Sequence, residues 1–163
     1  MIYIIPTKRG MGVEIWGTYD DLTNFYEVIG KFWNDEKYLG KKGFENRDKL
    51  ISSFSYEIRK AKESSRLKRK TNHFSPDQQE YFGCQLSWVH FLFSLTAIKF
   101  NMRYYETNKF DIAQILLIEF WLEKAMKSFD KVTAMNLIGF IEDGLYGANN
   151  YIYQYMRSIN LDY

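Results

Sequence analysis

The sequence has one cysteine, two histidines and two prolines among its 163 residues, and each shortage excludes a class of structure. A single thiol cannot form an intramolecular disulfide, which favours a reducing, cytoplasmic location. One cysteine and two histidines cannot complete a zinc site without carboxylates from distant parts of the chain, so we expect no metal and no other cofactor. Two prolines and ten glycines leave no long flexible linker, and we expect a single domain over residues 1–163.

Long apolar runs are missing as well. The longest, residues 86–100, is interrupted by serine, histidine, threonine and lysine side chains and is shorter than the ~20 residues that span a bilayer. The first residues lack the basic flank and the apolar core of a secretory signal. We therefore expect no membrane partner, although 46% of the side chains are apolar and are enough to build a core.

The spacing of the apolar residues predicts an α+β fold. Alternation in residues 2–5 and 13–16, on either side of a turn-forming stretch, predicts an N-terminal β-hairpin. Residues 66–71 also alternate, and we favour an edge strand over a charged loop there, which would make a three-stranded antiparallel sheet packed with helices. From residue 86 on the spacing is helical, so the chain has a mixed part at 1–72 and a helical part at 86–163.

Several helices follow from the 3.6-residue period. The clearest apolar stripe runs from Leu22 to Trp33, and a second helix is predicted over residues 47–61 after a polar loop at 34–46. Breaks are expected near residues 105–109, 130 and 144–149. Residues 112–129 form the most apolar helix, with polar groups mainly in one stripe at Glu119, Glu123 and Lys127. We expect this helix to lie in the core or, where the chain leaves it bare, to be covered by a second copy.

The N-terminus carries a recognisable pattern. Ile5-Pro6-Thr7, then residues 12–17 (GVEIWG) and 19–22 (YDDL), resemble the start of a family of small, uncharacterised bacterial proteins. In that family a hairpin of the form I-x-P-T … G-V-x-I-x-G-x-Y-x-D-L leads into an amphipathic helix, and the rest is mixed and then helical. The resemblance implies the α+β fold and a bacterial origin, and it transfers no catalytic residue.

Positive charge is concentrated in one stretch. Residues 59–70 carry a net charge of +6 in a chain whose total is +2. Such a run can contact nucleic-acid phosphates or an acidic partner. It is also typical of a protected sheet edge and of a helix C-terminus, and we favour this interpretation because no aromatic residue interleaves the run. The cations are Arg59, Lys60, Lys62, Arg66, Lys68, Arg69 and Lys70.

A small polar stripe runs along the first helix of the helical part, at Ser87, His90, Ser94 and Asn101. It could line a ligand pocket, but a helix contact or a solvent face is favoured, because an imidazole alone supplies neither a nucleophile nor its orienting partner. Cys84 with His90 or His73 matches no cysteine-enzyme motif, and a buried, inert thiol is the favoured interpretation. No catalytic, cofactor-binding or metal-binding residue is assigned.

Aromatic residues make up 18% of the chain. If residues 148–160 are helical, Tyr151 and Tyr155 share one face, while Ile152, Met156 and Ile159 share another that would pack inward. Tyrosines combine a broad apolar ring with a polar tip, which suits both the rim of a core and a partner surface. Both interpretations of Tyr151 and Tyr155 remain open.

Taken together, these features favour a non-enzymatic protein-interaction or regulatory module of a bacterium or its mobile elements. Its partner would be another protein or a second copy of itself. Two alternatives remain open: a nucleic-acid-binding module that uses residues 59–70, and a small-ligand binder or enzyme with a pocket near His90.

Overall fold

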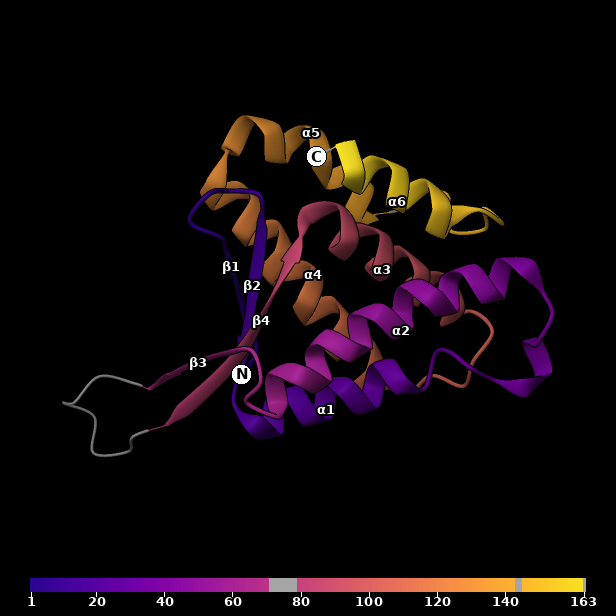
Figure 1. The fold of residues 1–163 in the computed structure, drawn as a ribbon, viewed down its shortest axis with the longest axis horizontal. Coiled ribbons are helices and arrows are strands. Elements are labelled where there is room, and N and C mark those ends of the chain that lie inside the picture. Colours follow the sequence, from indigo (N-terminus) through magenta and orange to yellow (C-terminus); the bar gives the residue numbers. More distant parts are fainter. Residues whose placement is uncertain (71–78, 143–144, 163) are drawn as a thin grey trace.

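The computed structural model describes residues 1–70, 79–142 and 145–162 (Figure 1). The elements confirm the α+β fold, with strands near the N-terminus and a helical second half. In chain order they are β1 (Tyr3–Pro6), β2 (Gly12–Gly17), α1 (Tyr19–Gly30), the 3₁₀ turn η1 (Glu36–Tyr38), α2 (Lys42–Lys62), β3 (Leu67–Lys70), β4 (Glu80–Ser87), α3 (Trp88–Asn101), α4 (Lys109–Phe129), α5 (Lys131–Glu142) and α6 (Ile152–Asp162).

The strands form one antiparallel sheet in the order β1-β2-β4-β3. The predicted hairpin is β1 and β2, and the predicted edge strand is β3, so both expectations are confirmed. The sheet nevertheless has four strands and not three, because β4 lies in a stretch that the helical interpretation left unassigned. Phe82, Cys84 and Leu86 point to the buried face of β4 and alternate with the less buried Tyr81 and Gln85, which is the signal that identifies this strand.

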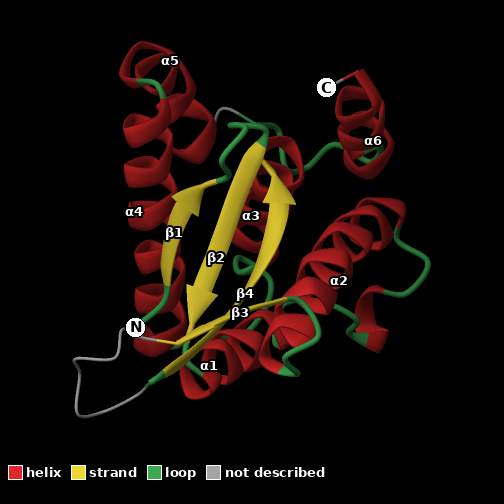
Figure 2. Cartoon of the chain, turned by 60° about the vertical axis from the view of Figure 1, so that its left-hand side comes forward, coloured by secondary structure: helices red, strands yellow, loops and turns green. Residues whose placement is uncertain are grey.

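Helices cover one face of the sheet, and α4 runs along its β1 edge (Figure 2). On the covered face, Ile4, Ile15 and Cys84 form one row across the three neighbouring strands. Behind this row lie the rings of Phe25, Phe54 and Phe91, one from each of α1, α2 and α3, with centroids 5.9 and 5.3 Å apart. A single hydrophobic cluster therefore joins the sheet to the helices.

Two helix boundaries differ from the predictions. Helix α2 begins at Lys42 rather than near residue 47, so the loop expected at 34–46 is wrong from residue 42 onward and also contains η1. Helix α1 ends at Gly30, although the apolar stripe continues, and Phe32 is buried outside the helix. Within the described residues, no helix is both long and apolar enough to cross a membrane.

Candidate functional site

Helix α4 has two apolar faces, and only one of them is buried. Its inner face packs against β1 and the core through five side chains that are almost inaccessible to solvent: Ile115, Ile118, Leu122, Ala125 and Met126. On the opposite side Ile112, Leu116 and Phe120 are 45%, 57% and 55% exposed. Residues four apart are neighbours on a helix surface, so these three side chains form one row. The expectation that residues 112–129 lie in the core is therefore right for one face of α4 only.

Charged residues close both ends of this row. Lys109 precedes it by one turn, and Glu123 follows it by one turn and forms an ion pair with Lys127. Glu119, which we expected in the same stripe, turns instead toward α3, where its Oε1 atom lies 2.6 Å from the Lys99 ammonium. Lys99 also donates to the carbonyl of Ile141 at 2.7 Å. Because Glu119 is paired with α3, the prediction that it shares a solvent-facing stripe with Glu123 and Lys127 is wrong.

Exposed apolar side chains continue beyond the end of α4. Asp130 adopts an extended conformation, with φ −149° and ψ 109°, which ends α4 at the predicted break. On either side of this break Phe129, Val132 and Met135 are exposed. Together with Ile112, Leu116 and Phe120, they place a large share of the exposed apolar side chains of the described residues on two consecutive helices.

Acidic partners offset much of the positive charge in residues 59–70. Glu57 accepts two hydrogen bonds from Arg66, at 2.8 and 3.1 Å, and Glu63 pairs with Lys60 at 3.0 Å. Glu80 on β4 faces Lys68 and Lys70 of β3 at 3.0 and 3.3 Å, and these hydrogen bonds lower the pKa of its carboxyl group. The pairing across the ladder fits the edge-strand interpretation of the run.

Aromatic rings meet the basic run in space, although none interleaves it in the sequence. The Arg69 guanidinium lies 5.1 Å from the ring centroid of Tyr3 and 4.8 Å from that of Trp16, on the face of the sheet turned away from the core. Lys62 lies 4.6 Å from the Tyr26 ring, and Arg59 lies 5.3 Å from the Tyr56 ring. These contacts place the cationic heads on the protein's own rings.

The polar stripe on α3 is a helix contact at two of its four positions, Ser94 and Asn101. Ser94 and Asn101 are fully buried, and the Ser94 hydroxyl donates to the carbonyl of Leu50 on α2 at 3.4 Å. Ser87 lies at the other end of the stripe, where its hydroxyl caps α3 by accepting from the His90 amide. Burial lowers the pKa of His90, and its Nε2 atom has no hydrogen-bond partner among the described residues.

Cys84 lacks the surroundings of a nucleophile. Its side chain is fully buried at the centre of the sheet, and this burial raises the pKa of the thiol to about 12. A thiol with so high a pKa is almost entirely protonated at neutral pH and does not attack substrates. His73, the second base considered for it, lies outside the described residues.

Arg47 organises a buried cluster that the sequence did not indicate. It is 3% exposed, and its guanidinium lies between the rings of Phe44 and Phe100, 4.5 and 4.4 Å from their centroids. It donates to the side-chain oxygen of Asn101 at 2.6 Å and to the carbonyl of Gly147 at 3.1 Å. Burial lowers the pKa of Arg47. Its hydrogen-bond partners, Asn101 and Gly147, are distant in the sequence. From the sequence alone Arg47 therefore cannot be distinguished from an exposed charged residue on an amphipathic helix.

Both C-terminal tyrosines are exposed, but only Tyr155 lies on a helix. Tyr151 and Tyr155 are exposed, whereas Ile152 and Met156 are buried, although α6 begins at Ile152 and not at residue 148. The Lys42 ammonium donates to the Tyr151 hydroxyl at 2.6 Å and lies 4.0 Å from the centroid of its ring. Tyr151 therefore already joins the C-terminal segment to the start of α2.

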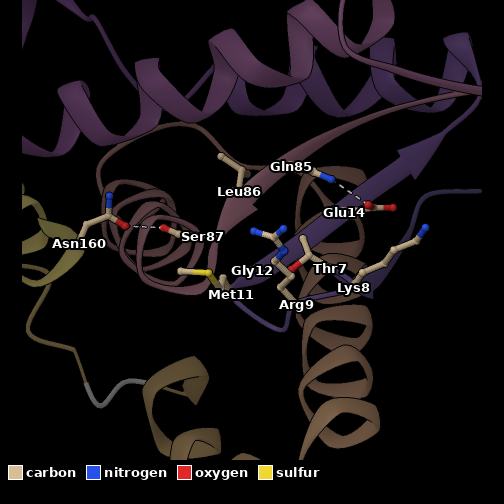
Figure 3. Close-up of a pocket in the computed structure, with 10 residues that line it drawn as sticks. All are labelled: Thr7, Lys8, Arg9, Met11, Gly12, Glu14, Gln85, Leu86, Ser87 and Asn160. Atoms are coloured by element: carbon tan, nitrogen blue, oxygen red, sulfur yellow. Dashed lines mark hydrogen bonds between the residues drawn. The ribbon is translucent and has the colours of Figure 1, made fainter. Parts of the chain in front are cut away.

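A cavity of about 690 Å³ opens between the β1–β2 turn and the start of α3 (Figure 3). Lys8 lies toward one end of the cavity, and Ser87 and Asn160 lie at the other. Glu14 accepts from Gln85 at 2.9 Å and from the Trp16 indole at 3.0 Å, so each of its carboxylate oxygens already has one donor within the protein. Of the stripe that we considered for a ligand pocket, Ser87 lines this cavity, whereas His90 is not part of its described lining.

Comparison with known proteins assigns the chain to a family. The family model for DUF6904, a domain of unknown function, matches the sequence over residues 2–163. The chain belongs to the DUF6904 family. No curated protein and no solved structure matches it.

The chemistry open to this DUF6904 member follows from the contacts above. Among the described residues, no group of three or more histidine, cysteine or carboxylate side chains could hold a metal ion. The Cys84 thiol is buried, and the Glu14 carboxylate accepts hydrogen bonds from Gln85 and Trp16. Ile112, Leu116 and Phe120 on α4 differ from them, because these side chains are large, apolar and open to solvent.

Proposed function

We propose that this chain is a non-enzymatic protein-interaction module, and that its contact surface is the outer face of α4. We call this surface the α4 row and define it as Lys109, Ile112, Leu116, Phe120 and Glu123. One observation carries the proposal: three large apolar side chains remain about half exposed on a helix whose other face fills the core. Single exposed apolar residues are common, whereas a contiguous row of them is typical of an interaction site.

The fold holds the α4 row in a fixed position. Asn108 and Asp111 cap the start of α4 reciprocally, and Asp111 also forms an ion pair at 2.8 Å with Lys31, the C-cap residue of α1. The buried face then anchors α4 along β1. A surface on such an anchored helix binds without first paying for its own ordering.

The energetic value of the row sets the size of the contact. Burying the exposed half of a leucine, isoleucine or phenylalanine side chain contributes roughly 1 kcal/mol. Three such side chains cannot by themselves offset the cost of association, which is at least about 4 kcal/mol. A partner must therefore meet the charged ends of the row as well, or extend over the neighbouring exposed residues of α5.

The nucleic-acid alternative has weaker support. Lys60, Arg66, Lys68 and Lys70 pair with carboxylates, so fewer cations are available to replace counterions on a phosphate backbone. Arg69 lies against Tyr3 and Trp16 on the protein's own sheet. The bacterial and cytoplasmic setting that the sequence favours is compatible with either role and belongs to the proposal.

Site-specific photocrosslinking tests the proposed surface. A benzoylphenylalanine in place of Leu116, in the full chain in its native cells, should give discrete crosslinked species under ultraviolet light. The matched control is the same amino acid in place of Leu39, which is exposed to a similar degree but lies in the loop after η1. If position 116 gives no more crosslinking than position 39, α4 is not a contact surface and the proposal is wrong.

A further inference from the structure

The ends of the α4 row suggest which partner it fits. Building on the proposed function, we propose that the partner is a second copy of the chain, and that two copies pair through α4 in antiparallel orientation around a twofold axis at Leu116. Three features support this arrangement: the alignment of the row, the order of its charges, and the open position of α4 in the fold.

The five residues of the α4 row share one side of the helix. At 3.6 residues per turn, they fall within about 80° of arc and extend over roughly 21 Å. Leu116 lies at the centre, with one apolar residue and then one charged residue on each side of it. The row is therefore long and narrow, which is the shape that a second helix can match.

The order of the residues is complementary to itself. When two copies of α4 run antiparallel with Leu116 at the axis, residues equally distant from Leu116 face each other. Ile112 of each copy then meets Phe120 of the other, and Lys109 of each copy meets Glu123 of the other. The twofold axis repeats every contact, so one apolar pair and one ion pair per copy become two of each.

The charges also discriminate against the parallel arrangement. Parallel copies in register would place Lys109 against Lys109 and Glu123 against Glu123, and like charges in contact are unfavourable. Lys109 forms no ion pair with any residue that the structure describes, whereas Glu123 is bonded to Lys127 of its own helix. In the antiparallel pair the free ammonium would reach a carboxylate that still has room for a second donor.

The position of α4 leaves space for a second copy. Figure 2 shows α4 at the border of the fold, next to the edge strand β1. The other strands and helices α1, α2 and α3 all lie to the same side of α4. Two chains can therefore meet through α4 without moving any other element. One helix pair covers less than the roughly 800 Å² per partner of a standard interface, so we expect a weak, concentration-dependent dimer.

Charge exchange tests the register. Sedimentation equilibrium of the full chain over a concentration series should show a monomer–dimer equilibrium. Lys109→Glu and Glu123→Lys should each weaken dimerisation about tenfold, because each creates two like-charge contacts. The double variant Lys109→Glu/Glu123→Lys should bring the dissociation constant back from the values of the single variants toward the wild-type value, because opposite charges again face each other between the copies, whereas the pair with Lys127 is lost in both the monomer and the dimer. Glu27→Lys, at an exposed site on α1, is the matched control and should have no effect.

Each result decides the matter. Restoration by the double variant supports the antiparallel pair, and a double variant weaker than both single variants overturns it. Leu116→Lys offers a second route, because it would place two ammonium groups together at the axis and should leave only monomer. A wild-type chain that stays monomeric up to about 1 mM overturns the second copy as partner. Crosslinks from position 116 to a different protein would then preserve the proposed function while this inference fails, and their absence would remove both.

Discussion

Helices α2 and α4 are equally long, at 21 residues each, but the sides that they turn to solvent differ in chemistry. Helix α2 buries Leu50, Ile51, Phe54 and Ile58 and carries mainly charged residues elsewhere. Helix α4 buries a comparable stripe and carries apolar side chains on the opposite side as well. The folding of the chain explains both inner stripes and the outer side of α2. It does not explain the outer side of α4, which is why we assign that side to a partner.

The largest effect should come from comparing the two faces of α4 with each other. Leu122→Ala removes a fully buried side chain and should lower the free energy of unfolding by about 3 kcal/mol, because it leaves a cavity. Leu116→Ala removes the same atoms from the exposed face and should change the free energy of unfolding by less than about 0.5 kcal/mol. Urea unfolding at a protein concentration too low for association measures both. Equal losses would mean that Leu116 is packed within the monomer, which contradicts the comparison.

The next largest effect concerns the charge that α2 buries. Arg47→Met keeps much of the volume between Phe44 and Phe100 but leaves the Asn101 oxygen and the Gly147 carbonyl without their donor. We expect a loss of about 2 kcal/mol in the free energy of unfolding, because unpaired buried polar groups are costly. Arg59→Ala on the same helix is the control and should cost less than about 0.5 kcal/mol. A loss no greater than that of the control would show that ring packing alone holds the cluster together.

The sequence predicts those parts of this comparison that depend on local spacing. The inner stripes of both helices follow from the 3.6-residue period, and the hairpin and the edge strand β3 follow from alternation. The apolar outer side of α4 was also visible, since residues 112–129 have too few polar positions to form a solvent face. These features can be predicted without knowing which distant residues contact them in the folded chain.

Features that depend on distant contacts could not be predicted in the same way. Arg47 looks like a surface residue until Asn101 and Gly147, far along the chain, are brought beside it. Glu119 belongs to a polar stripe by spacing, but Lys99 draws it inward. The positive charge of residues 59–70 is likewise partly neutralised by Glu57 and Glu80, which only the fold places beside Arg66 and Lys68. In each case tertiary pairing decides the role of a charge.

The smallest expected effect concerns the starts of the two helices. Helix α4 begins with the reciprocal cap of Asn108 and Asp111, whereas α2 begins after Lys41, whose side chain makes no capping hydrogen bond. Lys41 already has the extended backbone of a cap residue, with φ −87° and ψ 107°. Lys41→Asp should therefore add an acceptor for a free amide and a favourable charge, and raise the stability by about 0.5 kcal/mol.

The thermal midpoint should accordingly rise by roughly 1–2 °C for a chain of this size, whereas Asn108→Ala should lower it by a few degrees. Lys41→Ala is the control, because the Lys41 ammonium also lies 5.2 Å from the Tyr38 ring and both substitutions remove that contact. Differential scanning calorimetry of the three variants separates the cap from the ring contact. If Lys41→Asp melts no higher than Lys41→Ala, the start of α2 gains nothing from a cap, and the two helices differ at their starts for a reason other than the missing acceptor.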